Sequence, residues 1–277
     1  MIRVVRFVSS LESVLATDIN LIMDTSGNSV DPPCPALTES KSVTTRSVRH
    51  GSLLWRTLRI PFWLFCHLWL RLRISGREHL DLTRGGLLLV NHQSFLDPLL
   101  VAVFLGRPVS YLARDSLFRV PVLGWILRKT HVIPISREAA RGGSIRVALE
   151  RLENGFLVGI FPEGTRSPDG QVHKFRPGFL ALARRTQQPI YPVGIVGADH
   201  VMPRGALWIR PGRIQIVFGT PLTVDELRQL SEVNDDAALS EMARSRVEQC
   251  TAEAEQLLSS CRLTNAKATA DGSALPK

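Results

Sequence analysis

Short apolar runs alternate with longer mixed segments between residues 85 and 218. The wholly apolar run at 87–90 predicts a strand that is buried on both faces, and 156–161 and 190–196 predict further strands. Two more strands are predicted at 109–113 and 132–135, and helices at 98–105, 123–129, 143–154 and 177–185. This alternation predicts a single α/β domain, a mostly parallel mixed sheet flanked by helices.

The C-terminal part is predicted to contain a hairpin and helices. Segments 206–210 and 213–218, joined by Pro211 and Gly212, predict a β-hairpin. Thr223 and Glu226 have the spacing of a capping box, which opens a helix. A second helix, over 236–258, is rich in alanine and glutamate and is predicted to pack on the surface. The expected boundaries are 76–222 for the main domain, 223–258 for C-terminal helices and 259–277 for a disordered tail.

The first 75 residues divide into two parts. Residues 1–50 are predicted to be a poorly structured extension and linker, without the apolar region of a secretory signal. Residues 51–75 contain an apolar run, Ile60 to Leu70, whose eleven residues would cover only about 16 Å as a helix. With its tryptophans and flanking arginines, this run predicts an amphipathic, membrane-associating N-terminal helix that does not span the bilayer. The alternative is a buried helix that closes the core.

Charge adds a second indication of a membrane or an anionic ligand. The 277 residues carry a net charge of +9, and residues 51–222 hold 23 basic and 10 acidic side chains. This excess points to nucleic acid, an anionic membrane surface or a phosphorylated substrate. Its dispersal along the chain favours a membrane-facing enzyme. The segment Leu117 to Leu127 is predicted either to line an apolar channel or contact lipid, or to belong to the core.

Several chemistries lack their motifs. The chain has no G-x-S-x-G elbow, no Walker A loop and no G-x-G-x-x-G segment after a strand. Its four cysteines have neither metal-ligand spacing nor a CxxC pair. The sequence therefore disfavours a covalent serine intermediate, ATP, NAD and a zinc or iron–sulfur centre.

A first candidate motif follows the strand at 87–90. His92 lies at its carboxyl end, where open α/β sheets bind ligands, and Asp97 follows five residues later. A turn is needed to bring them together, and Asp97-Pro98 predicts a helix that begins there. His92 is then a base oriented by Asp97. In the alternative, Asp97 only caps the helix and His92 fills a loop.

A second candidate motif, FPEGTRS, follows the strand at 156–161. Gly164 would let the backbone approach an anion, and Arg166 could hold phosphate oxygens through two parallel hydrogen bonds. The alternative is an exposed turn with a Glu163–Arg166 surface pair. The other histidines, His173 among them, have no partner at a useful spacing and are predicted to be structural or exposed.

Together, HxxxxD and FPEGTRS resemble the glycerolipid acyltransferase family, and in particular its bacterial 1-acylglycerol-3-phosphate acyltransferases. Three further segments add to the resemblance, which covers roughly residues 74–222: Val132 to Arg137, Lys174 to Gly178 and Ile190 to Val193. The resemblance implies a catalytic domain that moves an acyl group from acyl-CoA or acyl carrier protein to the sn-2 hydroxyl of lysophosphatidic acid, giving phosphatidic acid.

The resemblance also implies roles for single residues. His92 would be the general base and Asp97 would orient it, while Arg137 and Arg166 would bind the acceptor phosphate. Gly164 and Thr165 would shape the turn, and Glu163 would lie near the glycerol or orient an arginine. No metal or cofactor is implied, nor is nucleic acid.

The implied location is the cytoplasmic face of the inner membrane, as a peripheral or monotopic protein. Two alternatives stay open. One is another acceptor, such as glycerol 3-phosphate or a lyso-aminolipid. The other is a basic, non-enzymatic protein that binds membrane or nucleic acid.

Overall fold

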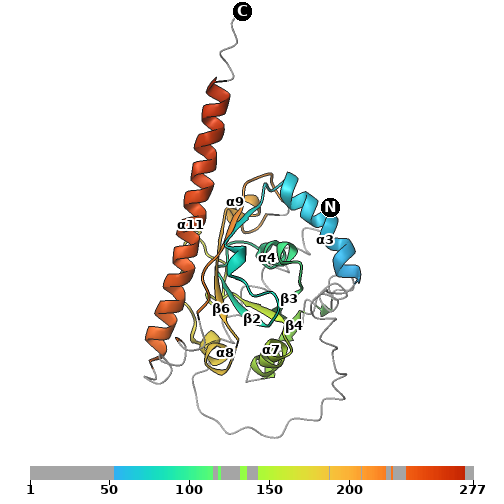
Figure 1. Cartoon of the computed structure of the whole chain (residues 1–277), viewed down its shortest axis with the longest axis vertical. Coiled ribbons are helices and arrows are strands. Elements are labelled where there is room, and N and C mark those ends of the chain that lie inside the picture. The colour runs from blue at the N-terminus through green and yellow to red at the C-terminus, as the bar shows by residue number, and fades with distance from the viewer. Residues whose placement is uncertain are drawn as a thin grey trace, which may run out of the picture.

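The computed structural model describes residues 53–114, 118–119, 132–135, 143–186, 188–206, 208–222, 226 and 235–271. Within these ranges a seven-stranded sheet has the order β1-β7-β6-β2-β5-β3-β4. Helices cover both faces of the sheet, and one long helix extends well beyond the globular part (Figure 1). The predicted α/β fold with a mostly parallel, mixed sheet is confirmed.

The central strand of the sheet is the one that precedes His92. The strands are β1 (Arg73–Ser75), β2 (Gly86–Val90), β3 (Val109–Arg114), β4 (Ile133–Ile135), β5 (Leu157–Ile160), β6 (Ile190–Val196) and β7 (Gln215–Phe218). Neighbouring strands pair in parallel, except β6 and β7, which are antiparallel. All of β2 is buried. Because both of its faces are covered, its apolar run is continuous and does not alternate with polar residues.

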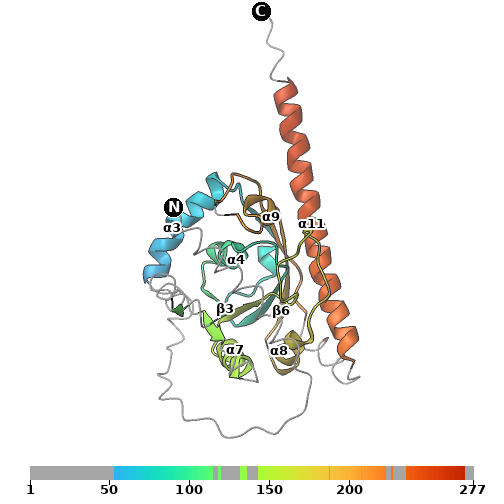
Figure 2. The same ribbon diagram turned by 180° about the vertical axis from the view of Figure 1, so that it is seen from behind.

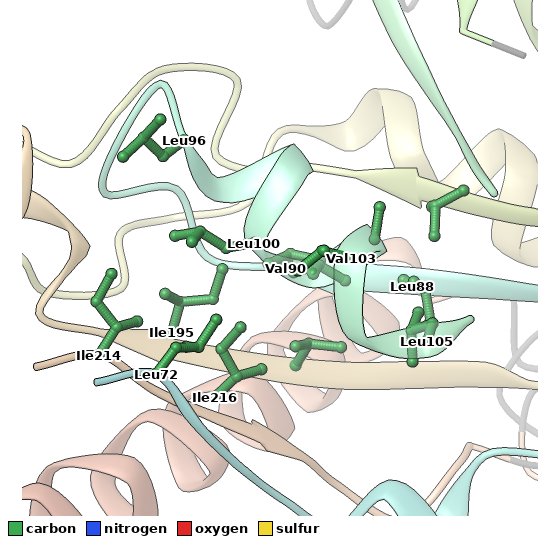
Figure 3. Packing of buried hydrophobic residues seen from close by; sticks show 14 of the residues in the cluster. Leu72, Leu88, Val90, Leu96, Leu100, Val103, Leu105, Ile195, Ile214 and Ile216 are labelled. Carbon is green, nitrogen blue, oxygen red and sulfur yellow. The ribbon is translucent and has the colours of Figure 1, made fainter. Parts of the chain in front are cut away.

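Each face of the sheet has its own set of helices. They are α3 (Leu53–Leu68), α4 (Asp97–Leu105), α7 (Gly143–Glu153), α8 (Leu180–Arg185), α9 (Ala198–Val201) and α11 (Asp236–Asp271), with 3-10 turns η1 (Arg77–His79) and η3 (Pro177–Phe179). α3, α4 and α9 pack on one face, where Leu88, Val90 and Leu100 belong to the core (Figure 3). α7, α8 and α11 pack on Leu87 and Leu89 of the opposite face. α3 and α11 therefore lie on opposite sides of the molecule (Figure 2).

The C-terminal helix is longer and more central than predicted. α11 continues through Asp271, so the prediction of a disordered tail from residue 259 is wrong as far as Asp271. No Pro or Gly occurs between residues 236 and 271 to end the helix earlier. α11 also packs on β6: a Cβ atom at Gly194 would lie 2.4 Å from the backbone of Cys250. A glycine in the strand and small residues on the helix allow this close approach.

The predicted hairpin at 206–218 is absent. Residues 208–210 form no strand, and β7 pairs with β6 and β1. The N–H of Arg210 donates to Val201 O at 2.9 Å, and that of Gly212 donates to Trp69 O at 3.3 Å. Because these N–H groups donate to other segments, they cannot form the hydrogen bonds that would join the two strands of a hairpin.

The segment 51–75 contains both a helix and a strand. α3 ends at Leu68, and β1 continues the sheet through the pairing of Arg73 with Gln215. The helix has two faces, since Cys66 is buried in the core whereas Leu64 and Leu68 are 49% and 67% exposed. One side of α3 therefore closes the core, as the second alternative predicts, and the other side is exposed. In the part of the chain that the structure describes, no helix is long and apolar enough to cross a membrane.

Some predictions fall outside the described residues. These are the extension 1–50, the helix at 123–129, Thr223 of the capping box and Arg137.

Candidate active site

The two polar motifs meet because β2 and β5 are parallel neighbours. Leu89 of β2 pairs with Ile160 of β5, so segments 91–97 and 161–167 leave the sheet at the same edge. The Ser167 N–H donates to His92 O at 2.6 Å and joins the segments directly. This is the carboxyl edge, where ligands bind in open α/β sheets.

The Asp97 carboxylate organises the turn that carries His92. Its Oδ2 atom lies 2.8 Å from His92 Nδ1 and accepts the N–H groups of Gln93 at 2.7 Å and Ser94 at 2.8 Å. α4 begins at Asp97, with Pro98 in its first turn, as predicted. The carboxylate, however, turns back toward residues 92–94 and does not cap the helix. The alternative in which Asp97 is only a cap is therefore wrong.

The contacts of the His92 ring leave its Nε2 atom available to act as a base. Nδ1 faces the fully buried Asp97, which as an acceptor keeps the proton on Nδ1 and leaves the lone pair on Nε2. The ring is 8% exposed and stacks on Phe161, with ring centroids 4.1 Å apart. Phe161 in turn stacks on Tyr111 at 5.6 Å. Gly159 makes room for this stack, because a Cβ atom there would lie 2.2 Å from the Tyr111 ring.

Glu163 is a buried carboxylate that bonds to the backbone of the site. Its Oε1 accepts the His92 N–H at 3.1 Å, and its Oε2 accepts the His173 N–H at 3.3 Å. Its own carbonyl accepts Arg176 Nε at 3.1 Å. Burial raises the pKa of the Glu163 carboxyl to about 7, although the two N–H groups oppose this rise. Glu163 therefore changes charge in the physiological pH range.

The rest of the FPEGTRS segment forms a tight turn. Gly164 has a φ of 74°, which favours glycine because other side chains strain in the left-handed region. Thr165 is half-buried, and Arg166 is only 9% exposed. The alternative of an exposed turn with a Glu163–Arg166 surface pair is wrong, because both side chains are buried.

Two amides that support the site were given no role by the sequence analysis. Asn91 bridges the end of β2 to β6: its Nδ2 donates to Ile195 O at 2.9 Å, and its Oδ1 accepts the Ile195 N–H at 2.7 Å. Gln93 Nε2 donates to Gly170 O at 3.0 Å. Only the position of these residues beside His92 could have indicated them.

His173 has a partner, contrary to prediction. Its Nε2 lies 2.8 Å from Asp169 Oδ1. Hydrogen bonds from His173, Gln171 and Ser167 lower the pKa of the Asp169 carboxyl to about 2. The four-residue spacing of Asp169 and His173 was the signal in the sequence. Among the described residues, no three His, Cys, Asp or Glu side chains are grouped as metal ligands.

The comparison with known proteins agrees with this geometry. A family model described as Acyltransferase matches residues 71–196. The 1-acyl-sn-glycerol-3-phosphate acyltransferase of Pseudomonas aeruginosa is 30% identical over 185 residues, or 63% of this chain and 71% of that protein. The chain belongs to the glycerolipid acyltransferase family. The range matched to the family model contains both polar motifs, from His92 to Ser167.

Other relatives show how far the family match extends. The 1-acyl-sn-glycerol-3-phosphate acyltransferase of Bacillus subtilis is 26% identical over 186 residues, or 67% of this chain and 90% of that protein. A chloroplastic relative from Arabidopsis thaliana is 30% identical over 61% of this chain, which spans about half of that protein (47%). The crystal structure of the Thermotoga maritima 1-acyl-sn-glycerophosphate acyltransferase has a TM-score of 0.55 and 28% identity, covering 68% of this chain and 79% of the other.

Proposed function

We propose that the chain transfers a fatty acyl group from a thioester to the sn-2 hydroxyl of 1-acylglycerol 3-phosphate, giving phosphatidic acid. The observation that carries this proposal is the contact between His92 and the buried Asp97, at 2.8 Å, on the sheet edge that also holds Arg166. The names of the relatives support the choice of acceptor.

In the proposed reaction, His92 Nε2 removes the proton from the acceptor hydroxyl. The oxygen attacks the thioester carbonyl carbon, the C–O bond forms and the C–S bond breaks. The imidazolium then returns its proton to the departing thiolate. Asp97 stays ionised and stabilises the imidazolium, which is the oriented form of general base catalysis.

Glu163 positions His92 in this proposal and does not contact the reacting atoms. It is 5% exposed, and its two oxygens join the peptide N–H groups of His92 and His173. Each oxygen faces one N–H donor, and the ionised carboxylate accepts from both more strongly than the protonated acid does. Protonation would set an O–H against one N–H and loosen the His92 backbone.

The variant Glu163→Gln tests this positioning role through the pH dependence of kcat/KM. In the wild type, Glu163 must be ionised to accept both N–H groups, so its protonation should add to the fall of kcat/KM as the pH decreases. The Glu163 pKa of about 7 places its part of that fall near neutrality. Glutamine does not titrate, so the variant should show a shallower slope near neutrality, with kcat at pH 8 lowered roughly tenfold and the acceptor KM unchanged. If the slope is the same in the variant, the ionisation of Glu163 does not contribute to the pH dependence of kcat/KM.

We assign phosphate binding to Arg166 and Arg137, with Gly164 and Thr165 shaping the turn around the phosphate. Arg166→Ala should raise the acceptor KM by roughly 10- to 150-fold, since a charge-assisted hydrogen bond is lost. Arg185→Ala is the matched control, because Arg185 is exposed on α8 and belongs to neither polar motif. A raised thioester KM with an unchanged acceptor KM would reassign Arg166 to the donor.

In this proposal the acyl donor is acyl-CoA or acyl carrier protein. The identity of the acceptor can be tested directly. Mass spectrometry of lipids made from a thioester mixture and several lyso-acceptors should show phosphatidic acid as the main product. A dominant product from glycerol 3-phosphate or a lyso-aminolipid would change the acceptor. A protein that binds these lipids without turnover would support the non-enzymatic alternative.

We further propose that α3 holds the protein on the cytoplasmic face of the inner membrane, as a peripheral or monotopic protein. The outer face of α3 exposes Ile60, Leu64 and Leu68 by 66%, 49% and 67%. These positions are four residues apart and form one apolar stripe. Trp63 is 40% exposed beside them, as suits a helix in the headgroup region.

Leu64→Gln and Leu68→Gln test the proposed anchor. Each should weaken partition into neutral vesicles roughly tenfold, because an apolar side chain no longer inserts. The thermal midpoint should change little, as both side chains lie outside the core. If both variants sediment with vesicles as the wild type does, α3 is not the anchor.

A further inference from the structure

The segment between α9 and β7, described at residues 203–206 and 208–213, forms a loop with Trp208 near its middle. Arg210 N–H donates to Val201 O at 2.9 Å and closes the base of the loop. The Ala206 N–H donates to Pro203 O at 3.0 Å and forms a turn within it. Trp208 is nevertheless 76% exposed. The backbone thus holds a large apolar side chain in water, which is unfavourable unless something covers it.

This loop is attached to the end of α3. Trp69 Nε1 donates to Ile209 O at 3.3 Å, and the Gly212 N–H donates to Trp69 O at 3.3 Å. In both views the loop that follows α9 passes beside the C-terminal end of α3 (Figures 1 and 2). Trp69 is itself 47% exposed and Leu68 is 67% exposed. Two segments far apart in the sequence therefore present neighbouring apolar side chains.

The Asp, Glu, Lys and Arg side chains within the two segments are all basic. Arg71, Arg204 and Arg210 are exposed. Residues 68–77 and 200–224 contain no Asp or Glu. A partner for this surface must therefore combine negative charge with an apolar layer that accepts tryptophan.

We propose that loop 203–213 and the end of α3 form one docking surface for an anionic phospholipid bilayer. Trp208 and Trp69 would enter the headgroup boundary, and the three arginines would contact lipid phosphates. The inference extends the membrane contact of α3 and rests on that part of the proposed function. The Ser94 hydroxyl donates to Met202 O at 3.1 Å, so the same docking would hold the His92 turn close to the lipid.

Co-sedimentation with vesicles tests this surface without reference to catalysis. The full chain is mixed with phosphatidylcholine vesicles, or with vesicles that also contain phosphatidylglycerol. Trp208→Ala should weaken binding to both roughly tenfold. The double variant Arg204→Gln/Arg210→Gln should lose roughly thirtyfold on the anionic vesicles only. Arg185→Gln, on the opposite face, is the control for simple loss of charge.

The outcomes separate this proposal from the proposed reaction. If the variants bind both vesicles as the wild type does, the docking surface is wrong, whatever the activity. If they lose binding as expected but the wild type makes no lipid product, the docking surface is supported and the proposed reaction is wrong. If Trp208→Ala instead converts a dimer to a monomer in analytical ultracentrifugation and leaves vesicle binding unchanged, the surface joins two copies of the chain and the lipid proposal is overturned.

Discussion

His92→Ala should lower kcat by roughly 10²- to 10⁴-fold, the contribution expected of a positioned general base. The loss should appear equally in kcat and kcat/KM, because the proton is removed only in the transition state. The affinity for lysophosphatidic acid should stay near the wild-type value, since the imidazole holds no part of the phosphate. Steady-state kinetics with a soluble short-chain acceptor measures both quantities without interference from vesicles.

A matched histidine variant controls for the loss of an imidazole. His200→Ala removes a side chain that is 83% exposed and pairs with Asp199. It should leave kcat unchanged. If His92→Ala kept wild-type turnover, the assignment of the base would be wrong, and a protein that only binds lipid would become the better interpretation.

Asp97→Asn should cost roughly 10²- to 10³-fold in kcat with little change in stability. The N–H groups of Gln93 and Ser94 both point at the position of Oδ2. They should hold the asparagine oxygen there, so Nδ1 of His92 keeps its proton and Nε2 keeps its lone pair. What the variant loses is the negative charge that stabilises the imidazolium.

Asp97→Ala separates charge from structure. It leaves two buried backbone N–H groups without an acceptor, at about 1–3 kcal/mol each. The thermal midpoint should therefore fall for alanine and hold for asparagine, while kcat falls for both. If Asp97→Asn retained full activity, Asp97 would be a structural residue of the turn only.

Much of the fold followed from the chain itself. The leucine run of β2 has no alternation, which identifies a strand buried on both faces, and Pro98 correctly placed the start of α4. Two of the predictions that failed share a cause. The segment before β7 and the face of α11 depend on partners far away in the sequence, such as Trp69 for Gly212 and Gly194 for Cys250. Local periodicity contains no information about such partners.

The candidate site divides in the same way. The sequence by itself determined which chemical groups are present: His92 and Asp97 after one apolar strand, and Glu163 to Arg166 after another. Only the tertiary structure decided how they are used, because the pairing of β2 with β5 brings two segments 71 residues apart, such as His92 and Glu163, into hydrogen-bonding distance. Glu163, for example, is buried and accepts the His92 backbone N–H, a contact that neither motif predicts by itself. The sequence specifies the residue types, but contacts and burial arise only when distant segments pack together.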